Sequence, residues 1–393
     1  MPLIWLIAGE PSGDVLGARL MAALARHAPG IRFAGVGGPL MQAGGLASLF
    51  PFENLALMGL VEVLPRLRLI QSRLHESAAD IARLRPDTVV TIDSPGFTLR
   101  LLRAIRPLGI PRAHYVAPQV WAWRQSRVRR FPGLWERLLC LFPFEPAFFT
   151  RHHLPASFVG HPVLESALDK GNPQRFRARH QIPADQPILI VMPGSRPGEV
   201  ARHGGIFGAA LGLLLTRHPG LRPVVPATPA VRSSLASVLA GWPLAPIVPE
   251  SADEKADAFA AASAALCKSG TSALELALGA VPMVIAYRLN PITALIARRL
   301  VTVPHASLVN LLAEREVVPE LLQECCTPER LAAALITLLD DNTAASAQRA
   351  AFAPVLASLA PPSATPSEAA AQAVLELLAA RSQSPDARLP GRQ

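Results

Sequence analysis

The residue types best suited to chemistry lie in two short loops of the second half of this 393-residue chain. The first loop reads Pro-Gly-Ser-Arg and follows an apolar run at 188–192, which predicts a buried strand. Gly194, Ser195 and Arg196 therefore stand at a helix start, where free N–H groups, the helix dipole and a guanidinium favour phosphate. Glu199 opens that helix. The pattern predicts a site for a phosphorylated ligand.

The second loop reads Lys-Ser-Gly-Thr and ends another predicted strand. Ser269, Gly270 and Thr271 offer hydroxyl and N–H groups, and Glu275 lies one helical turn beyond Thr271 on the same face. A diphosphate on the N–H groups of the two loops and a ribose diol on Glu275 would match a nucleotide sugar. Helix capping alone would also explain Ser269 or Thr271.

A third loop, in the first half, joins an apolar run to an amphipathic helix through Gly-Glu-Pro-Ser-Gly-Asp. Its Ser12, Gly13 and Asp14 predict an anion or sugar contact at a helix N-terminus, although the string is neither a P-loop nor a GxGxxG fingerprint. Capping by Ser12 or Asp14 is the alternative. Gly37 and Gly38, after the second predicted strand, allow close approach of a ligand or form an ordinary turn.

The string from His114 to Arg124 contains Trp121 and Trp123, which point the same way only in an extended chain. We expect these two indoles to form an apolar wall at the ligand site. Four arginines follow closely, and their mixture with aromatic residues also fits nucleic acid. A buried Trp beside a solvated basic helix is the commoner meaning of such a pattern. The four are Arg124, Arg127, Arg129 and Arg130.

These loops are positioned by short apolar runs that alternate with helix-period segments, which predicts an α/β fold with parallel sheets. In the first half the expected strands are 3–9, 31–36, 87–93, 111–116, 137–142 and 156–159, and the expected helices are 14–28, 66–85, 97–107 and 144–152. In the second half the expected strands are 187–192, 222–226, 245–248, 263–267 and 282–286, followed by helices 328–340, 343–358 and 367–381.

This count predicts two Rossmann-like, doubly wound domains, 1–168 and 169–366, that face a cleft. We expect helix 367–381 to pack back on the first domain and 382–393 to be disordered.

Composition excludes several classes of protein. Half of the residues are apolar and 17% are charged, so the chain is neither wholly disordered nor fibrous. The longest uncharged windows are broken by Gly or Pro, and the N-terminal run lacks a basic region before it, so we expect no spanning helix and no export signal. Four cysteines show no metal spacing, which predicts reduced thiols and no metal site.

The charge is unevenly distributed along the chain. Residues 1–165 hold 18 arginines and 11 acids, so most of the net charge of +9 lies there and favours anionic partners.

Taken together, the strings resemble the lipid-A-disaccharide synthase family over about residues 3–380. The matching pieces are 8–14, 58–64, 114–124, Gly160-His161-Pro162, 193–196, 269–271 and 307–312. The resemblance implies a GT-B glycosyltransferase that works with inversion and without metal or other cofactor. It implies transfer of 2,3-diacylglucosamine from UDP to 2,3-diacylglucosamine 1-phosphate, giving the β-1,6 disaccharide of lipid A. It also adds Asn310 to the UDP site and Met58 and His114 to the sugar site.

The general base is the one role that does not carry over from the resemblance. Family members commonly read Asp-x-Pro-Asp/Glu-Phe, whereas this chain reads Asp-Ser-Pro-Gly-Phe, with Gly96 at the second carboxylate position. Asp93, at the end of strand 87–93, is our candidate base and Glu10 the reserve. The alternative for Asp93 is that it only holds the turn.

The resemblance implies lipid substrates and hence a cytoplasmic enzyme, peripheral on the inner face of the inner membrane, with a homodimer as a further possibility. Residues 57–73 mix apolar side chains with Arg66, Arg68 and Arg73, which predicts a lipid-facing patch or a core helix with a solvated edge. Two alternative functions remain open. One is another UDP-sugar enzyme of this fold, such as a UDP-GlcNAc 2-epimerase or a peptidoglycan-type transferase. The other is a non-enzymatic binder of anionic lipid or nucleic acid.

Overall fold

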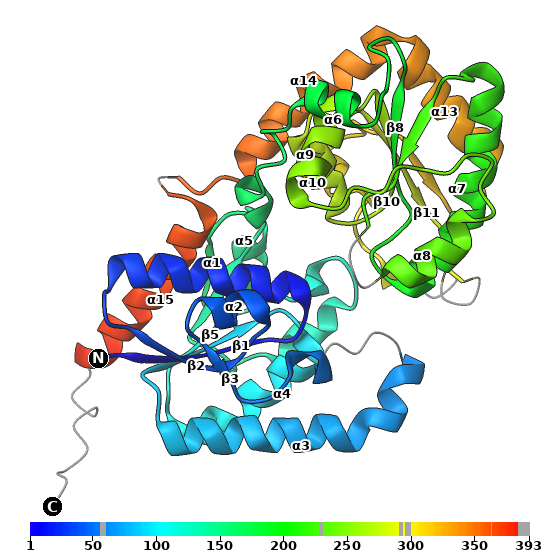
Figure 1. Ribbon diagram of the computed structural model, residues 1–393. Helices are drawn as coiled ribbons and strands as arrows, with labels where there is room; N and C mark the ends of the chain where they lie inside the picture. Colours follow the sequence, from blue (N-terminus) through cyan, green and yellow to red (C-terminus); the bar gives the residue numbers. More distant parts are fainter. Residues whose placement is uncertain (56–59, 228–230, 291–293, 295–299, 363, 384–393) are drawn as a thin grey trace, which may run out of the picture. The chain divides into compact units, whose positions relative to one another are not determined.

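The structure is a computed structural model that describes residues 1–55, 60–227, 231–290, 294, 300–362 and 364–383. The chain divides into two compact units, Met1–Pro162 with Leu359–Gln393, and Val163–Ser358. The boundaries expected from the sequence, after residues 168 and 366, lie several residues downstream of these divisions. Each unit is described below by itself (Figure 1).

The first unit is built on a parallel seven-stranded sheet with the order β3-β2-β1-β4-β5-β6-β7. Because β1 pairs with both β2 and β4, the chain winds outward in both directions from β1. The central strands are almost completely buried, which explains their mostly apolar sequences. The strands are β1 (Leu3–Ala8), β2 (Arg32–Val36), β3 (Ala47–Ser48), β4 (Thr88–Ile92), β5 (Arg112–Tyr115), β6 (Arg137–Cys140) and β7 (Ala156–Phe158).

Helices cover both faces of this sheet. In Figure 1, α1 and α15 lie on one side of it and α3 and α4 on the other, and each pair is in contact. The indole of Trp5 in β1 donates to Asp80 Oδ2 in α3 at 2.9 Å, which fixes α3 on its face of the sheet. The helices are α1 (Pro11–His27), α2 (Pro39–Ala43), α3 (Leu60–Leu84), α4 (Pro95–Ile105), α5 (Glu145–Thr150) and α15 (Pro366–Gln383), with 3-10 turns at Gln119–Trp121 and Gln125–Arg130.

The second unit contains a parallel five-stranded sheet with the order β12-β11-β10-β8-β9. Its strands are β8 (Ile188–Met192), β9 (Arg222–Val224), β10 (Ala264–Lys268), β11 (Met283–Tyr287) and β12 (Glu320–Leu322). Its helices are α6 (Pro173–Arg179), α7 (Pro197–Arg217), α8 (Arg232–Leu239), α9 (Ala252–Ala261), α10 (Ser272–Leu278), α12 (Leu308–Ala313), α13 (Pro328–Asp340) and α14 (Asn342–Ser358).

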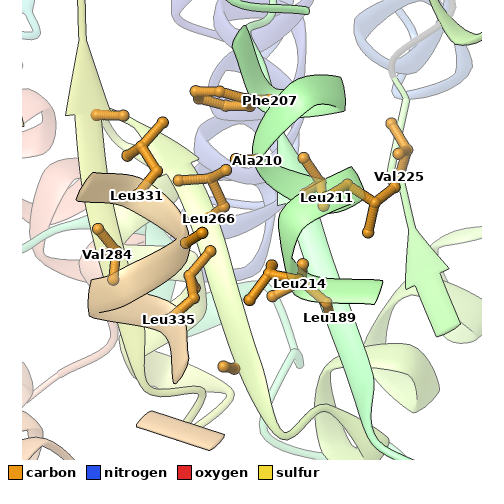
Figure 2. Close-up of a cluster of buried hydrophobic side chains, with 14 of the residues drawn as sticks. Leu189, Phe207, Ala210, Leu211, Leu214, Val225, Leu266, Val284, Leu331 and Leu335 are labelled. Atoms are coloured by element: carbon orange, nitrogen blue, oxygen red, sulfur yellow. The ribbon is translucent and has the colours of Figure 1, made fainter. Parts of the chain in front are cut away.

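The core of the second unit fixes α7 against the sheet. Figure 2 shows side chains of α7 and α13 packed on those of β8, β10 and β11, and every one of them is buried. This layer holds the N-terminus of α7 at the carboxyl edge of the sheet, which is the position from which a helix can bind a ligand. The labelled residues are Leu189, Phe207, Ala210, Leu211, Leu214, Val225, Leu266, Val284, Leu331 and Leu335.

The α/β class with two parallel sheets is confirmed, and a few elements differ from expectation. The strand expected at 245–248 is a single β-bridge at Ile247, because the neighbouring Pro243, Pro246 and Pro249 have no N–H for a ladder. Helix α1 begins at Pro11 instead of 14, since proline suits the first helical position. The tail expected at 382–393 lies, from 384 on, outside the described residues. Among the described helices, none has the length and apolarity needed to cross a membrane.

Candidate active site

The two anion loops of the second unit lie side by side at one edge of its sheet. Strands β8 and β10 are hydrogen-bonded neighbours in parallel register, so the loops that follow them emerge together. Ser195 and Arg196 are exposed at the N-terminus of the 21-residue helix α7, and Thr271 is exposed in the second loop. The structure therefore brings together the predicted phosphate ligands and leaves the side chains of Ser195, Arg196 and Thr271 accessible.

A buried ion pair joins these two loops. Glu199 Oε1 accepts from Lys268 Nζ at 3.1 Å, while its Oε2 accepts from the Ser195 N–H at 3.0 Å. Burial tends to raise the pKa of Glu199, but the ammonium of Lys268 and the Ser195 N–H outweigh it and hold the pKa below its usual value. Glu199, expected among the UDP ligands, is thus a brace between the loops.

Two glycines make this close arrangement possible. Gly194 has φ +155°, and a Cβ there would lie 2.4 Å from the Cβ of Glu199. Gly270 has φ +153°, and a Cβ there would lie 2.9 Å from Lys268 Nζ. Both positions combine a backbone that L side chains rarely adopt with a neighbour of the ion pair, so glycine is required at each.

His203, which sequence reasoning missed, ties a third loop to the site. Its Nδ1 lies 2.9 Å from the Pro193 carbonyl oxygen, and its Nε2 accepts from the Arg288 N–H at 3.1 Å. The ring is fully buried, and burial lowers its pKa. Its Nε2 accepts a backbone N–H, which only the neutral ring can do. It therefore bridges the loops after β8 and β11. The one sequence feature that could have indicated this role is that His203 lies one helical turn after Glu199, on the same helix face.

Two other predicted ligands of this unit, Glu275 and Ser269, form hydrogen bonds within it. Glu275 is half-buried and accepts from Lys255 Nζ at 2.9 Å, so its carboxylate is held at the start of α10. The hydroxyl of Ser269 donates to the Ala306 carbonyl at 2.6 Å and thereby joins the second loop to the segment before α12.

Asn310 does not have the position expected of a UDP ligand. Its side chain is fully buried: Oδ1 accepts from the Val317 and Val318 N–H groups, and Nδ2 donates to the Val318 carbonyl and to Glu320 Oε1. All of its hydrogen-bonding capacity is used inside the unit. The expectation is corrected: Asn310 holds the turn before β12.

In the first unit, the ends of β1, β4 and β5 meet at one edge and carry strained backbone. Asp93 and Ser94 follow β4 with φ values of +49° and +46°, and the β-branched Val116 follows β5 with φ +77°. The Asp93 N–H donates to Tyr115 O at 2.8 Å, and the Thr98 hydroxyl donates to Asp93 O at 2.7 Å. Such strain persists only where the surroundings fix it, and it clusters at functional sites. Glu10 follows β1 at the same edge, half-buried as Asp93 is.

The loop after β1 has a structural task that corrects one prediction. Both carboxylate oxygens of the buried Asp14 accept backbone N–H groups at the start of α2, from Leu40 and Met41, each at 3.0 Å. Asp14 therefore caps a neighbouring helix and is not a sugar ligand. A Cβ at Gly38 would lie 2.6 Å from its Oδ2, which accounts for that glycine.

Three other predicted sugar ligands lie around that cap. Gly37 and Gly13 are buried, with Gly13 packed on Ala8, whereas Ser12 is exposed. Met58 lies outside the described residues.

The two tryptophans do not form a common wall. A 3-10 turn at Gln119–Trp121 replaces the expected extended chain, so Trp121 is buried while Trp123 is 40% exposed. The Trp121 indole donates at 2.9 Å to Glu145 Oε1, a carboxylate that sequence reasoning missed. Oε2 of Glu145 accepts from the Leu141 and Phe142 N–H groups. Burial raises the pKa of Glu145 to about 7 against these hydrogen bonds.

His114 is unsuited to the role of a base at the surface. It is fully buried, its Nδ1 lies 2.7 Å from the Thr91 hydroxyl, and its ring stacks on Trp135. Burial lowers its pKa to about 4, so the ring is neutral near pH 7. His114 thus supports β5 from inside the sheet layer.

The chain shares its fold with solved structures that include a UDP complex and a glycosyltransferase. A UDP complex of MnaA from S. aureus matches with a TM-score of 0.63 at 13% identity and covers 95% of each chain. The calicheamicin glycosyltransferase CalG4 matches with a TM-score of 0.57 at 16% identity over 96% of this chain and 98% of its own. At these identities the likeness shows the fold alone, which is that of GT-B enzymes.

Sequence comparison narrows the class to one family. The model of the lipid-A-disaccharide synthetase family matches residues 4–374. A lipid-A-disaccharide synthase of Gluconobacter oxydans is 56% identical over 376 residues, which cover 96% of this chain and 91% of the relative. The chain belongs to the lipid-A-disaccharide synthase family and is a glycosyltransferase of lipid A biosynthesis. The alternatives of an epimerase, a peptidoglycan-type transferase or a non-enzymatic binder are not favoured.

The raised pKa of Glu145 gives a testable pH dependence. Between about pH 4.5 and about pH 7 the folded state holds a proton that the unfolded state releases, so this group stabilises the fold at low pH and its contribution is lost as pH rises. The slope from this group is at most about 1.4 kcal/mol per pH unit. Chemical denaturation across that range should show a flatter profile for Glu145→Gln than for the parent. An equal slope in both proteins would contradict the assignment, and Glu53→Gln, at an exposed carboxylate, is the control.

The His203 bridge can be tested one loop at a time. His203→Asn keeps a donor for the Pro193 carbonyl, His203→Gln keeps an acceptor for the Arg288 N–H, and His203→Leu keeps neither. We expect His203→Leu to weaken UDP binding by on the order of tenfold in calorimetry, because each loosened loop must be ordered again on binding. The two amide variants should lie between. Leu211→Ala, in the core face of α7, serves as the control for stability, and an equal loss of UDP affinity there would refute the bridge.

Proposed function

We propose that this chain transfers a 2,3-diacylglucosamine residue from UDP to the 6-hydroxyl of 2,3-diacylglucosamine 1-phosphate, with inversion and with release of UDP. The observation that carries the proposal is the braced pair of loops in the second unit. Glu199 and Lys268 pair with each other, and the buried His203 joins the first loop to the loop after β11. Ser195, Arg196 and Thr271 remain exposed beside them. The family membership supplies the substrate class for this site.

In the proposed complex, the diphosphate of the donor meets the N-terminus of α7 and the guanidinium of Arg196. The N–H groups of Gly194, Gly270 and Thr271 add donors from both loops. These fixed dipoles stabilise the negative charge that develops on the departing UDP, which is the largest usual source of catalysis in such transfers. Glu275 is placed for the ribose hydroxyls, with Lys255 holding its carboxylate in place.

The first unit supplies the acceptor side in this proposal. Asp93, at the strained end of β4, is the base that takes the proton from the attacking hydroxyl, with Glu10 in reserve. Ser12, Gly13, Gly37 and Trp123 border the same edge or the loops that leave it, and His114 and Trp121 support these loops from within. The inner-membrane surface on the cytoplasmic side and a second copy of the chain complete the proposed partners.

The 57–73 patch contributes less charge to membrane contact than its sequence predicts. Arg73 pairs with Glu76 at 2.6 Å and lies over the ring of Phe50, so its guanidinium is already engaged. Leu67 is 42% exposed and Arg68 is exposed, and they can still meet lipid. Ile70 packs against the core cluster beneath α3.

The direct test is the product. The purified chain is incubated with UDP-2,3-diacylglucosamine and 2,3-diacylglucosamine 1-phosphate, and the lipids are analysed by mass spectrometry. A tetraacyl disaccharide monophosphate that forms together with UDP supports the proposal. Conversion of UDP-GlcNAc to its 2-epimer in a parallel reaction, with no disaccharide, would refute it.

Arg196→Ala should lower turnover by about 100-fold or more, the usual cost of losing a donor that stabilises developing charge. Arg222→Ala, at an exposed arginine of the same unit, is the matched control and should be neutral. Both proteins are assayed with a chelator present, because the guanidinium and the helix N-terminus replace a metal in this proposal. Normal turnover of Arg196→Ala, or loss of parent activity with chelator, would contradict the assignment.

The base can be tested by moving the carboxylate along the turn. Asp93→Asn should lower turnover by about 100-fold with UDP affinity unchanged. A Cβ at the exposed Gly96 would meet no atom within 4 Å, and the helix N-terminus there favours an acid, so Gly96→Asp should fold normally. We expect Asp93→Asn combined with Gly96→Asp to recover part of the lost turnover. Full activity in folded Asp93→Asn would transfer the role to Glu10 or to water.

A further inference from the structure

One surface of the first unit carries arginines without acids. Between Asp93 and Glu136 the sequence contains eight arginines and not one Asp or Glu. The buried Arg112 is used internally, because its guanidinium pairs with Glu136 at 2.6 Å and donates to the Leu102 carbonyl. The other seven are exposed, and we call them the arginine surface: Arg100, Arg103, Arg106, Arg124, Arg127, Arg129 and Arg130.

The structure joins these residues into one surface. Arg100, Arg103 and Arg106 follow one another at three-residue spacing on α4 and the turn after it, so they share one face. Arg103 donates to the Arg130 carbonyl at 3.4 Å. The guanidinium of Arg106 lies 3.0 Å from the position that a Cβ on Gly133 would take. Helix α4 is thereby attached to the segment that carries the other four.

The arginine surface has no counter-charge of its own. Within the described part of the chain, none of its seven guanidinium groups forms an ion pair within 4 Å, although eight other arginines do. Like charges held close together repel one another, and an external anion that neutralises them is bound favourably. The chemistry of the surface therefore fits a partner with many negative charges.

An exposed indole stands among these charges. Trp123 is 40% exposed, and the guanidinium of Arg124 lies 4.9 Å from the centre of its ring. Tryptophan favours the boundary between headgroups and acyl chains, where its apolar body and its N–H are both accommodated. Single-stranded nucleic acid instead requires a series of aromatic platforms, and this surface presents one.

We infer that the arginine surface docks on the anionic phosphate headgroups of a lipid bilayer, with Trp123 inserted at the interface. The inference rests on the proposed function, whose substrates are lipids, and it names the face of the first unit that meets their membrane. Helix α4 packs beside α3, so the exposed Leu67 and Arg68 belong to the same layer of this unit (Figure 1).

The test measures binding to vesicles of phosphatidylcholine with and without phosphatidylglycerol, by flotation. One variant changes Arg100, Arg103 and Arg106 to Gln, and a second changes Arg127, Arg129 and Arg130 to Gln. The matched control removes the same charge from exposed arginines of the second unit, Arg222, Arg232 and Arg315. Each arginine near an anionic surface contributes about fivefold, so each test variant should bind anionic vesicles on the order of 100-fold less tightly than the parent. The control should bind as the parent does.

Two further measurements separate the possible failures. Turnover on substrates in neutral detergent micelles should be the same in all variants, which shows that they fold and that the proposed function holds independently. Parent protein that makes the disaccharide but binds both vesicle types equally would overturn the inference while leaving the function intact. Equal losses in the control and test variants would assign binding to overall charge and overturn it too. Loss of single-stranded RNA binding, with vesicle binding unchanged, would replace the bilayer by nucleic acid.

Discussion

The parallel pairing of the strands is the constraint on which the rest of the structure depends. In a parallel sheet every strand leaves its carboxyl end at the same edge, so loops that are far apart in the sequence emerge together. In the second unit this rule brings the loops after β8, β10 and β11 to one edge. In the first unit it does the same for the residues that follow β1, β4 and β5. The buried strands supply only the edge, and the chemistry comes from the loops.

At the edge of the second unit, two sets of residues do different work. Glu199 and Lys268 pair with each other, and Glu199 and His203 also bind backbone groups. Because they satisfy the buried polar groups, the exposed Ser195, Arg196 and Thr271 can stay solvated until a ligand arrives. The arrangement resembles preorganised sites in general, where the cost of ordering the loops is met during folding and not during binding.

The sequence predicted the α/β class and the loops at the strand ends because both follow from local patterns. Gly194, Ser195 and Arg196 could be found from an apolar run followed by a helix start. Asp14 and Asn310 were misjudged because their partners, Leu40 and Glu320, come from segments whose approach no local pattern reveals. Trp121 was misjudged because a 3-10 turn interrupts the extended chain. Glu145 and His203 were missed because Trp121 and the Arg288 N–H, which complete their hydrogen bonding, lie 24 and 85 residues away in the sequence.

The first unit is discontinuous in the sequence, and this has a consequence for its synthesis. Helix α15 packs on α1, and the Leu359 carbonyl accepts from the His161 N–H at 3.0 Å, so the last-made helix completes the first-made sheet layer. At about 5–20 residues per second, α1 waits roughly 20–70 s on the ribosome for this cover. Val163–Ser358, by contrast, is contiguous and can fold while it is being made. A nascent chain of this protein therefore presents an uncovered apolar helix face to chaperones for most of its translation.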